Sequence, residues 1–265
     1  MTLTIFQQLF AVGIGSALVM LALWALQLRT RDAGVVDVAW SACLGLAALF
    51  GALTGPGDPS RRLLIGVIGG IWGIRLALHL LFDRVLQGPE DGRYQMMREK
   101  FGPRANAIFL AFFEAQALLV VMLCVPFLLA CADRRAGPTP VDLAGGLLWL
   151  FAIIGESIAD RQLARFKRNP ASAGQVCNVG LWRYSRHPNY FFEWLIWCAF
   201  ALVAFSAPHG WIAFSAPALM LLFILRFTGI PPTEARALRS RPDAYCRYQQ
   251  TTSAFIPWFP KAPTP

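Results

Sequence analysis

The sequence Gly180-Leu-Trp-Arg-Tyr-Ser-Arg-His-Pro-Asn-Tyr190 is a polar stretch between two apolar segments, each long enough to cross a membrane. Ionisable side chains close to hydrocarbon are costly and are usually functional. Within eight residues the chain offers donors, acceptors and a cation, from Arg186, His187, Asn189, Tyr190 and Glu193. The stretch therefore indicates a membrane protein that holds a large polar ligand, with phosphates or a carboxylate, at the membrane face.

Composition supports a membrane location. The 265 residues are 56% hydrophobic and 15% charged, with a mean hydropathy of +0.50, whereas a soluble domain carries about 25% charged residues. A transmembrane helix needs roughly 20 apolar residues. Seven segments fit, at 5–28, 37–54, 63–85, 106–132, 141–164, 189–208 and 211–230. We expect an all-α integral membrane protein with about seven transmembrane helices, in one domain over 1–265 whose cofactor-binding part is mainly 156–265.

The net charge of +9 is explained by the distribution of basic residues. With these spans, 18 of the 24 Lys and Arg residues lie on the side of the C-terminus. The other side holds only Arg61, Arg62, Arg134 and Arg135. Cytoplasmic loops are enriched in Lys and Arg, so we predict a cytoplasmic C-terminus and cofactor site. The basicity then requires no nucleic acid, and we expect no chemistry in the external loops 54–60 and 136–140.

Motifs for several other chemistries are missing from the sequence. The six cysteines form no Cys-x-x-Cys pair, and the spacing of Cys and His gives no zinc or haem site, so we expect no metal. No Gly-x-Gly-x-x-Gly follows a strand, which argues against a Rossmann site. The motifs Gly-x-Ser-x-Gly and His-Glu-x-x-His are also absent.

Two acidic residues mark the cytoplasmic end of the fifth span. Glu156 and Asp160 are four apart, so they share one face of a helix. They could bind ligand hydroxyls or an amide, and Lys167 and Arg168 beyond them could bind phosphates. Ordinary basic flanking of a span, with an acid–base pair, is the alternative.

A second pair lies in the apolar third span. Arg75 and His79 are also four apart, and a charge near mid-span costs at least ~2.5 kcal/mol. Arg75 should therefore face a polar cavity or form a structural ion pair. Asp37, at the start of the second span, is a candidate partner or a helix cap.

Two further polar segments follow spans. In Glu90–Arg98, Arg93 and Arg98 could clamp phosphates, since guanidinium groups bind them bidentately. Tyr94 could donate a proton or stack on a ring, and a solvated amphipathic loop is the alternative. Glu234 follows the last span as a ligand contact or as an acid in the first turn of the next helix.

The pattern Asp160-x-x-Leu163…Lys167…Gly180-Leu-Trp…Tyr184-Ser-Arg-His-Pro-Asn-Tyr190-x-x-Glu193 resembles the C-terminal domain of the steroid 5α-reductases. Sterol C14 and delta-7 reductases are similar there. Asp37-Val-Ala-Trp40, Glu90-Asp-Gly-Arg-Tyr94 and Thr252-Ser-Ala-Phe-Ile-Pro257 resemble an uncharacterised bacterial branch of that superfamily. Isoprenylcysteine carboxyl methyltransferases and phospholipid methyltransferases carry a similar Arg-His-Pro-x-Tyr motif and bind S-adenosylmethionine with it. The motif therefore indicates a superfamily and leaves the cofactor open.

The resemblance implies a seven-helix fold that binds NADPH from the cytosol, in the inner membrane of a bacterium. The candidate cofactor-binding residues are Asp160, Lys167, Arg168, Asn178, Trp182, Tyr184, Arg186, His187, Asn189, Tyr190, Glu193 and Glu234. Steroid 5α-reductases pair an early Gln-Glu motif with a Tyr that polarises the steroid ketone. This chain has no Gln-Glu, and Asp37 occupies roughly that region, which puts a steroid substrate in question.

These observations favour NADPH-dependent reduction of a carbon–carbon double bond in a steroid-like or other lipid. The cofactor would supply the hydride, and Asp37, His79 and Tyr94 are the candidate catalytic donors. The expected partners are the bilayer and a hydrophobic substrate. An S-adenosylmethionine-dependent membrane methyltransferase is the first alternative, and a lipid-binding protein without catalysis is another.

Topology gives the first prediction. Cysteines introduced in 86–105, in 165–188 and near the C-terminus should react with an impermeant thiol reagent only from the cytoplasmic side, because 18 basic residues lie there against four. Labelling of intact cells or spheroplasts from the outside would reverse the orientation and remove cytosolic access to the cofactor.

Overall fold

The computed structural model describes residues 2–86 and 90–262, apart from the side chain of Arg84. Within them, seven helical segments are long and apolar enough to cross a membrane: Ile5–Thr30, Val35–Thr54, Pro59–Asp83, Gly92–Ala132, Pro140–Arg168, Pro188–Phe205 and Gly210–Ser240. The described chain contains no strand, only an isolated bridge between Ser185 and Ser253. The predicted all-α membrane fold with about seven transmembrane helices is confirmed.

The boundaries of some predicted spans differ from the structure for local reasons. Helix α3 (Pro59–Leu80) begins earlier than predicted, because Asp58 caps it by accepting from the backbone N–H groups of Ser60 and Arg61. The predicted span 106–132 consists of α5 (Ala105–Leu123) and α6 (Val125–Ala132), preceded by α4 (Gly92–Phe101). Pro126 lies at the start of α6, and a proline removes a backbone donor and interrupts a helix.

The described chain forms two compact units. The first unit comprises the residues up to Leu143 together with Leu202–Ala213, and the second comprises Ala144–Ala201 together with the residues from Phe214 onward. Each unit is described by itself below. The expectation of one domain over the whole chain stays a prediction.

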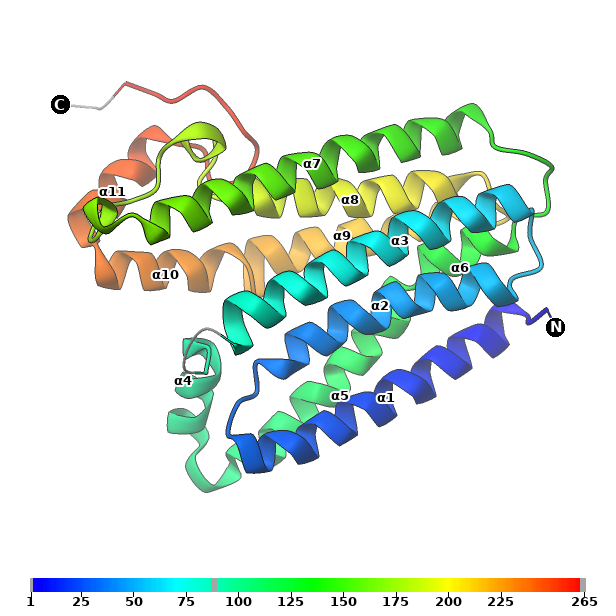
Figure 1. The fold of residues 1–265 in the computed structure, drawn as a ribbon, viewed down its shortest axis with the longest axis horizontal. Helices are drawn as coiled ribbons and strands as arrows, with labels where there is room; N and C mark the ends of the chain where they lie inside the picture. Colours follow the sequence, from blue (N-terminus) through cyan, green and yellow to red (C-terminus); the bar gives the residue numbers. More distant parts are fainter. Residues whose placement is uncertain (1, 87–89, 263–265) are drawn as a thin grey trace. The chain divides into compact units, whose positions relative to one another are not determined.

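Close helix packing organises the first unit, in which α2 (Val35–Thr54) runs between α1 (Ile5–Thr30) and α3 (Figure 1). Small residues line the contact between α2 and α3. A Cβ atom added at Gly73 would lie 2.5 Å from the Cα atom of Gly45, and one added at Gly69 would lie 2.5 Å from the Cβ atom of Ala48. Small residues of this kind let membrane helices approach closely, where dispersion forces hold them together.

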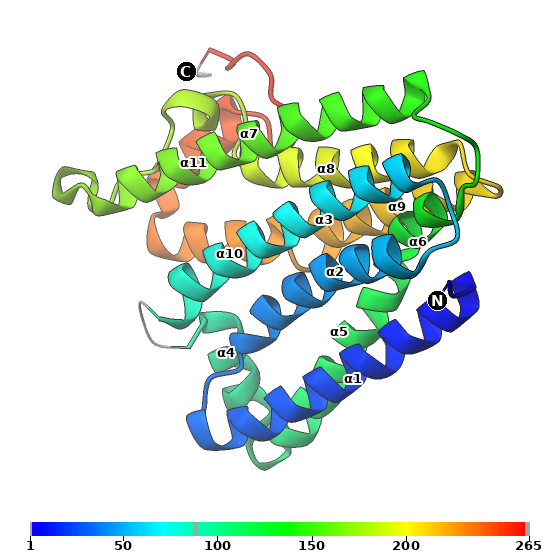
Figure 2. The same cartoon turned by 45° about the vertical axis from the view of Figure 1, so that its right-hand side comes forward.

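Helix α5 lies beside α1 in both views, and α4 lies at the end of the unit where α1 ends and α2 begins (Figure 2). The Trp24 indole donates to the carbonyl of Asn106 over 2.8 Å. Met20, Phe109 and Phe113 fill the space between these helices. The first unit therefore presents the N-terminus of α2 and the whole of α4 at one polar end.

The second unit contains most of α7 (Pro140–Arg168) and α8 (Pro188–Phe205), with α9 (Ser215–Leu222), α10 (Ile230–Ser240) and α11 (Pro242–Thr251). Gly155 of α7 receives the ring of Phe192 of α8, since an added Cβ atom there would lie 2.4 Å from that ring. The Trp194 indole donates to the carbonyl of Pro217 over 3.1 Å and so joins α8 to α9.

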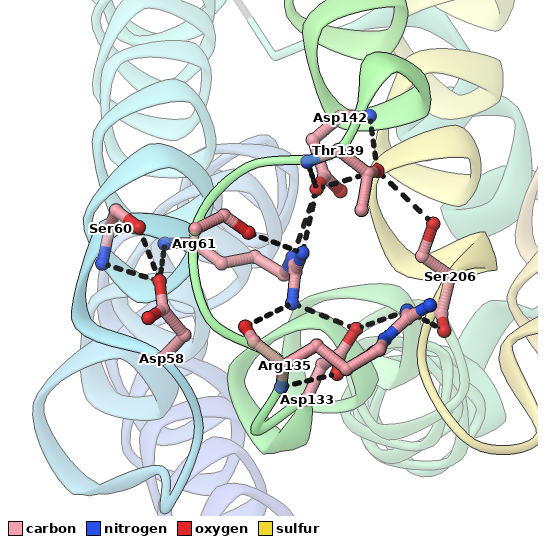
Figure 3. Close-up of polar contacts among 9 residues, drawn as sticks. Asp58, Ser60, Arg61, Asp133, Arg135, Thr139, Asp142 and Ser206 are labelled. Atoms are coloured by element: carbon pink, nitrogen blue, oxygen red, sulfur yellow. Dashed lines mark hydrogen bonds and ion pairs between the residues drawn. The ribbon is translucent and has the colours of Figure 1, made fainter.

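A buried arginine closes the opposite end of the first unit (Figure 3). The Arg61 side chain is inaccessible to solvent, and its guanidinium lies 2.9 Å from a carboxylate oxygen of Asp133 and 2.9 Å from one of Asp142. It also donates to the carbonyl of Gly137 over 2.9 Å. Loop 136–140 therefore wraps a buried cation of the first turn of α3, a structural role that the sequence did not indicate. The expectation of no chemistry in loops 54–60 and 136–140 stays a prediction.

Removal of this cation should destabilise the protein. Arg61→Met leaves the buried carboxylate of Asp142 without its cation and leaves Asp133 with Arg135 alone, and breaking a buried pair costs about 3–5 kcal/mol. The expected result is a clearly lower midpoint of thermal unfolding in detergent. Arg134→Met is the matched control, because Arg134 is exposed. Equal midpoints for the two variants would contradict a stabilising role for Arg61.

Candidate functional site

The first polar cluster is formed by Asp37, Asp91, Arg93 and Tyr94, and is called the Asp37 cluster here. Asp37 lies in the first turn of α2, and Arg93 and Tyr94 lie in the first turn of α4, which Asp91 caps by accepting from the Arg93 N–H. The Arg93 guanidinium donates to one oxygen of Asp37 over 2.7 Å, and the Tyr94 hydroxyl donates to the other over 2.9 Å. Both carboxylate oxygens of Asp37 are therefore engaged.

Tyr94 is the buried member of the Asp37 cluster. It is 2% exposed, and its ring packs edge-on against Phe109 at 6.2 Å and Phe112 at 5.9 Å. The side chains of Asp37 and Arg93 remain 17% and 33% exposed. The Tyr94 phenol is held rigidly and is hydrogen-bonded to the more accessible carboxylate of Asp37. Such a pair can supply a proton to a bound ligand.

The structure thus brings together two of the three predicted catalytic residues, Asp37 and Tyr94. The third, His79, lies exposed in the last turn of α3 in the same unit. Helices α2 and α3 are antiparallel neighbours, so His79 belongs to the end of the unit at which α2 begins (Figure 1). The pairing of Asp37 with Arg75 stays a prediction.

The predicted phosphate clamps of Glu90–Arg98 are occupied by acidic partners. Arg93 pairs with Asp37 and with Asp91, and Arg98 pairs with Glu90 over 2.8 Å. Phosphate binding by Arg93 and Arg98 stays a prediction. The alternative of a solvated amphipathic loop is wrong, because Gly92–Phe101 forms a helix whose Tyr94 is buried. Sequence alone could not show this, since nothing local pairs Arg93 with a residue 56 positions away.

The second polar cluster surrounds Glu234, the fifth residue of α10, and is called the Glu234 cluster. Its members are Arg186, His187, Glu234, Tyr245 and Gln249. One carboxylate oxygen of Glu234 accepts from Arg186 over 2.7 Å and from the Tyr245 hydroxyl over 3.3 Å, and lies 3.2 Å from His187 Nε2. The other oxygen accepts from Gln249 over 2.7 Å. This carboxylate joins the loop before α8 to α10 and α11.

Arg186 also fastens the C-terminal segment. Its Nη1 atom donates to the carbonyls of Gln249, over 3.1 Å, and Thr252, over 2.6 Å, and its backbone N–H donates to Ser253 over 2.8 Å. A guanidinium has five N–H donors, and these contacts engage its Nε and Nη1 atoms. The role of Arg186 in cofactor binding stays a prediction, and its structural role is evident from the geometry.

Two tyrosines of α11, Tyr245 and Tyr248, also join this helix to the Glu234 cluster and to the loop before α8. The Tyr248 hydroxyl donates to the carbonyls of Trp182 and Ser185. Burial raises the pKa of Tyr248, and burial followed by the negative charge of Glu234 raises the pKa of Tyr245. Both phenols therefore stay protonated at neutral pH and act as donors. Ser185 is buried and donates to the carbonyl of Phe255 over 2.8 Å.

His187 and Tyr190 form a stacked pair at the start of α8. Their ring centroids are 5.3 Å apart with an interplanar angle of 5°. The Tyr190 hydroxyl lies 3.2 Å from the Thr233 hydroxyl. His187 is 3% exposed, so its ring is held between Tyr190 and Glu234.

Asp160 and Asn189 meet between α7 and α8. The Asn189 amide nitrogen lies 3.4 Å from an oxygen of Asp160, a weak hydrogen bond. The amide oxygen of Asn189 is buried and has no hydrogen-bond partner among the described residues. A buried acceptor without a partner is costly, so this oxygen is a position where a ligand donor would fit.

The remaining predicted cofactor residues fall into two groups. Trp182 is buried and donates to the carbonyl of Ala159 over 2.9 Å, and Glu193 accepts from the Trp197 indole over 3.0 Å. Those contacts hold the loop and α8 in place. The exposed residues are Lys167, Arg168, Asn178 and Tyr184. Gln249 was not anticipated, and no local signal in the sequence marks it.

A comparison with known protein families matches a range of residues that includes both polar clusters. A model for a family of proteins of unknown function, DUF1295, matches residues 23–252. The chain belongs to the DUF1295 family. The matched residues include every member of the Asp37 cluster and of the Glu234 cluster. This DUF1295 protein is 29% identical over 237 residues to an uncharacterized protein of Schizosaccharomyces pombe, with 76% of this chain and 67% of the yeast protein covered. No solved structure matches.

The Glu234 cluster makes a specific prediction for this DUF1295 protein. Arg186→Ala should release the segment 252–257, because it removes the cation of Glu234 and two bonds to carbonyls; the cost is about 3 kcal/mol or more. Limited proteolysis or hydrogen exchange, without any nucleotide, should show faster cleavage or exchange there. Arg247→Ala is the control, since Arg247 is an exposed residue of α11. Unchanged protection of 252–257 in Arg186→Ala would contradict the structural role.

Proposed function

We propose that this protein reduces a carbon–carbon double bond of a lipid with NADPH, and that Tyr94 provides the proton. The observation that carries the proposal is the hydrogen bond of 2.9 Å between the buried Tyr94 hydroxyl and Asp37. The resemblance of 156–193 to the steroid 5α-reductases and sterol reductases supports the reaction class. The location of the site on the cytoplasmic side of a bacterial inner membrane is part of the proposal.

Reduction of a double bond adds a hydride to one atom and a proton to another. NADPH supplies the hydride when bound, and the residues of the chain must supply the proton. The Tyr94 phenol is the candidate because aromatic packing fixes its position. Asp37 orients the phenol and, being partly exposed, can exchange protons with solvent. Arg93 holds Asp37 in place over 2.7 Å.

The second unit offers groups that suit a dinucleotide. The unpartnered amide oxygen of Asn189 can accept from a carboxamide or an amino group. Lys167 and Arg168 are exposed, and neither side chain has a hydrogen bond or ion pair to the rest of the described chain. They lie about two turns beyond Asp160 on α7, about 11 Å along the axis. These free cations can meet phosphate groups.

The alternative is an S-adenosylmethionine-dependent methyltransferase of a lipid or prenylated substrate, and the pairing of the arginines favours it. A large number of cations available to a ligand would favour NADPH, since that cofactor has three phosphate groups. However, Arg93, Arg98 and Arg186 are all engaged in ion pairs. Of the five cations considered for the phosphates, Lys167 and Arg168 are not engaged in an ion pair among the described residues, and S-adenosylmethionine needs fewer cations.

Nucleotide binding separates the two functions. Purified protein should be stabilised by NADPH at low micromolar concentration, and NADH should bind about ten- to hundredfold more weakly, because a charge-assisted hydrogen bond is worth roughly 1.5–3 kcal/mol. Calorimetric titration measures both affinities. Lys167→Ala or Arg168→Ala should weaken NADPH binding and narrow the gap to NADH. Arg134→Ala and Tyr94→Phe should leave the NADPH affinity unchanged.

The same titration includes S-adenosylmethionine. Stabilisation by S-adenosylmethionine, with no response to NADPH, would reject the reductase and support the methyltransferase. A response to neither would leave both enzymatic functions without support.

A further inference from the structure

The C-terminal segment carries large apolar side chains on the surface. Ile256 is 59% exposed, Trp258 68% and Phe259 75%, and Tyr184 beside them is 37% exposed. These four residues are called the aromatic tail patch. They lie outside the seven membrane-spanning segments. Several exposed aromatic side chains in one place usually mark a surface that is covered by another molecule.

Backbone contacts hold this patch in a defined position. The Trp258 N–H donates to the carbonyl of Tyr184 over 2.8 Å, and the Lys261 N–H donates to Thr251 over 2.8 Å. The rings of Tyr184 and Phe259 pack edge-on at 6.1 Å, and those of Trp258 and Phe259 at 6.4 Å. The aromatic side chains are therefore displayed on a fixed support instead of being folded into the core.

The length of α8 gives the depth of the patch relative to the bilayer. Its 18 residues, Pro188–Phe205, span about 27 Å at 1.5 Å per residue. The hydrocarbon core is about 30 Å thick, so Pro188 lies at the hydrocarbon boundary. Tyr184 comes just before Pro188 and contacts Phe259 and Trp258. The patch is consequently at the level of the lipid headgroups.

The residue types in and around the aromatic tail patch indicate which molecule covers it. Trp and Tyr are enriched at the interface between membrane and water. Two exposed cations flank the patch, Arg183 and Lys261, and such residues attract anionic headgroups. We infer that the segment Ile256–Lys261 is an anchor that lies in the headgroup layer of the bilayer and binds anionic phospholipids. Exposed aromatic side chains next to two exposed cations favour the bilayer over a protein partner.

Depth-dependent quenching tests the inference. Phe259→Cys is made in a Cys246→Ser background, because Cys246 is the exposed cysteine and the other five are buried or half-buried. The cysteine carries an environment-sensitive fluorophore, and the full chain is placed in nanodiscs of phosphatidylcholine, with or without phosphatidylglycerol. The quenchers are lipids with a bromine or nitroxide near the headgroup and, separately, aqueous iodide.

Ala173→Cys is the matched control. Helix α7 has 29 residues, about 44 Å, so its end at Arg168 extends beyond the hydrocarbon, and the exposed Ala173 follows it. The label at 259 should be quenched severalfold more by lipid than the label at 173, and less by iodide. Arg183→Ala with Lys261→Ala should reduce that lipid quenching only when phosphatidylglycerol is present.

Two results would overturn the inference. If iodide quenches the label at 259 as strongly as the label at 173, the patch faces water. If neither quencher reaches the label at 259, protein covers the patch, either a second copy or another chain. The result is independent of nucleotide binding, so it can fail while the proposed function stands.

Discussion

An ionised side chain close to hydrocarbon must be paired, because an isolated charge there costs several kcal/mol. The polar parts of this protein follow that requirement. Arg61 lies between Asp133 and Asp142, Arg93 pairs with Asp37, and Arg186 pairs with Glu234. Each pair lies at the end of a membrane-spanning segment, where the chain leaves the apolar region.

These pairs also determine which segments meet. Arg61 and Asp142 are 81 residues apart, Asp37 and Arg93 are 56 apart, and Arg186 and Glu234 are 48 apart. The apolar middles of the helices are held by close packing of small residues, as at Gly45 and Gly73. An added Cβ atom at Gly73 would clash with Gly45, so this packing also restricts how α2 and α3 can slide along each other. The ion pairs add contacts at the helix ends, and the pair of Arg93 with Asp37 joins α4 to α2 beside the bond of Tyr94 to Asp37.

The sequence was sufficient to predict the helices and two residues of the Asp37 cluster. Segment length and apolar content depend on local composition, so seven spans could be read directly. Asp37 stood out as an acid at the start of an apolar span, and Tyr94 as a possible proton donor in the polar segment after the next span. The pairing of charges is a tertiary property and could not be read: Arg93 and Arg98 were considered as phosphate ligands and Arg186 as a cofactor ligand, and their acidic partners were not foreseen. Gln249 has no local signal, since its role arises only when α11 lies against Glu234.

The central claim is that hydride and proton are added to a lipid, and isotope transfer tests it most directly. NADPH deuterated at the transferred position of its nicotinamide ring is incubated with the protein in nanodiscs containing a lipid extract, and the lipids are analysed by mass spectrometry. The account predicts a reduced lipid that carries one carbon-bound deuterium, and its loss in Tyr94→Phe although that variant still binds NADPH. A lipid that gains a methyl group from labelled S-adenosylmethionine, with no deuterium transferred from NADPH, would contradict it.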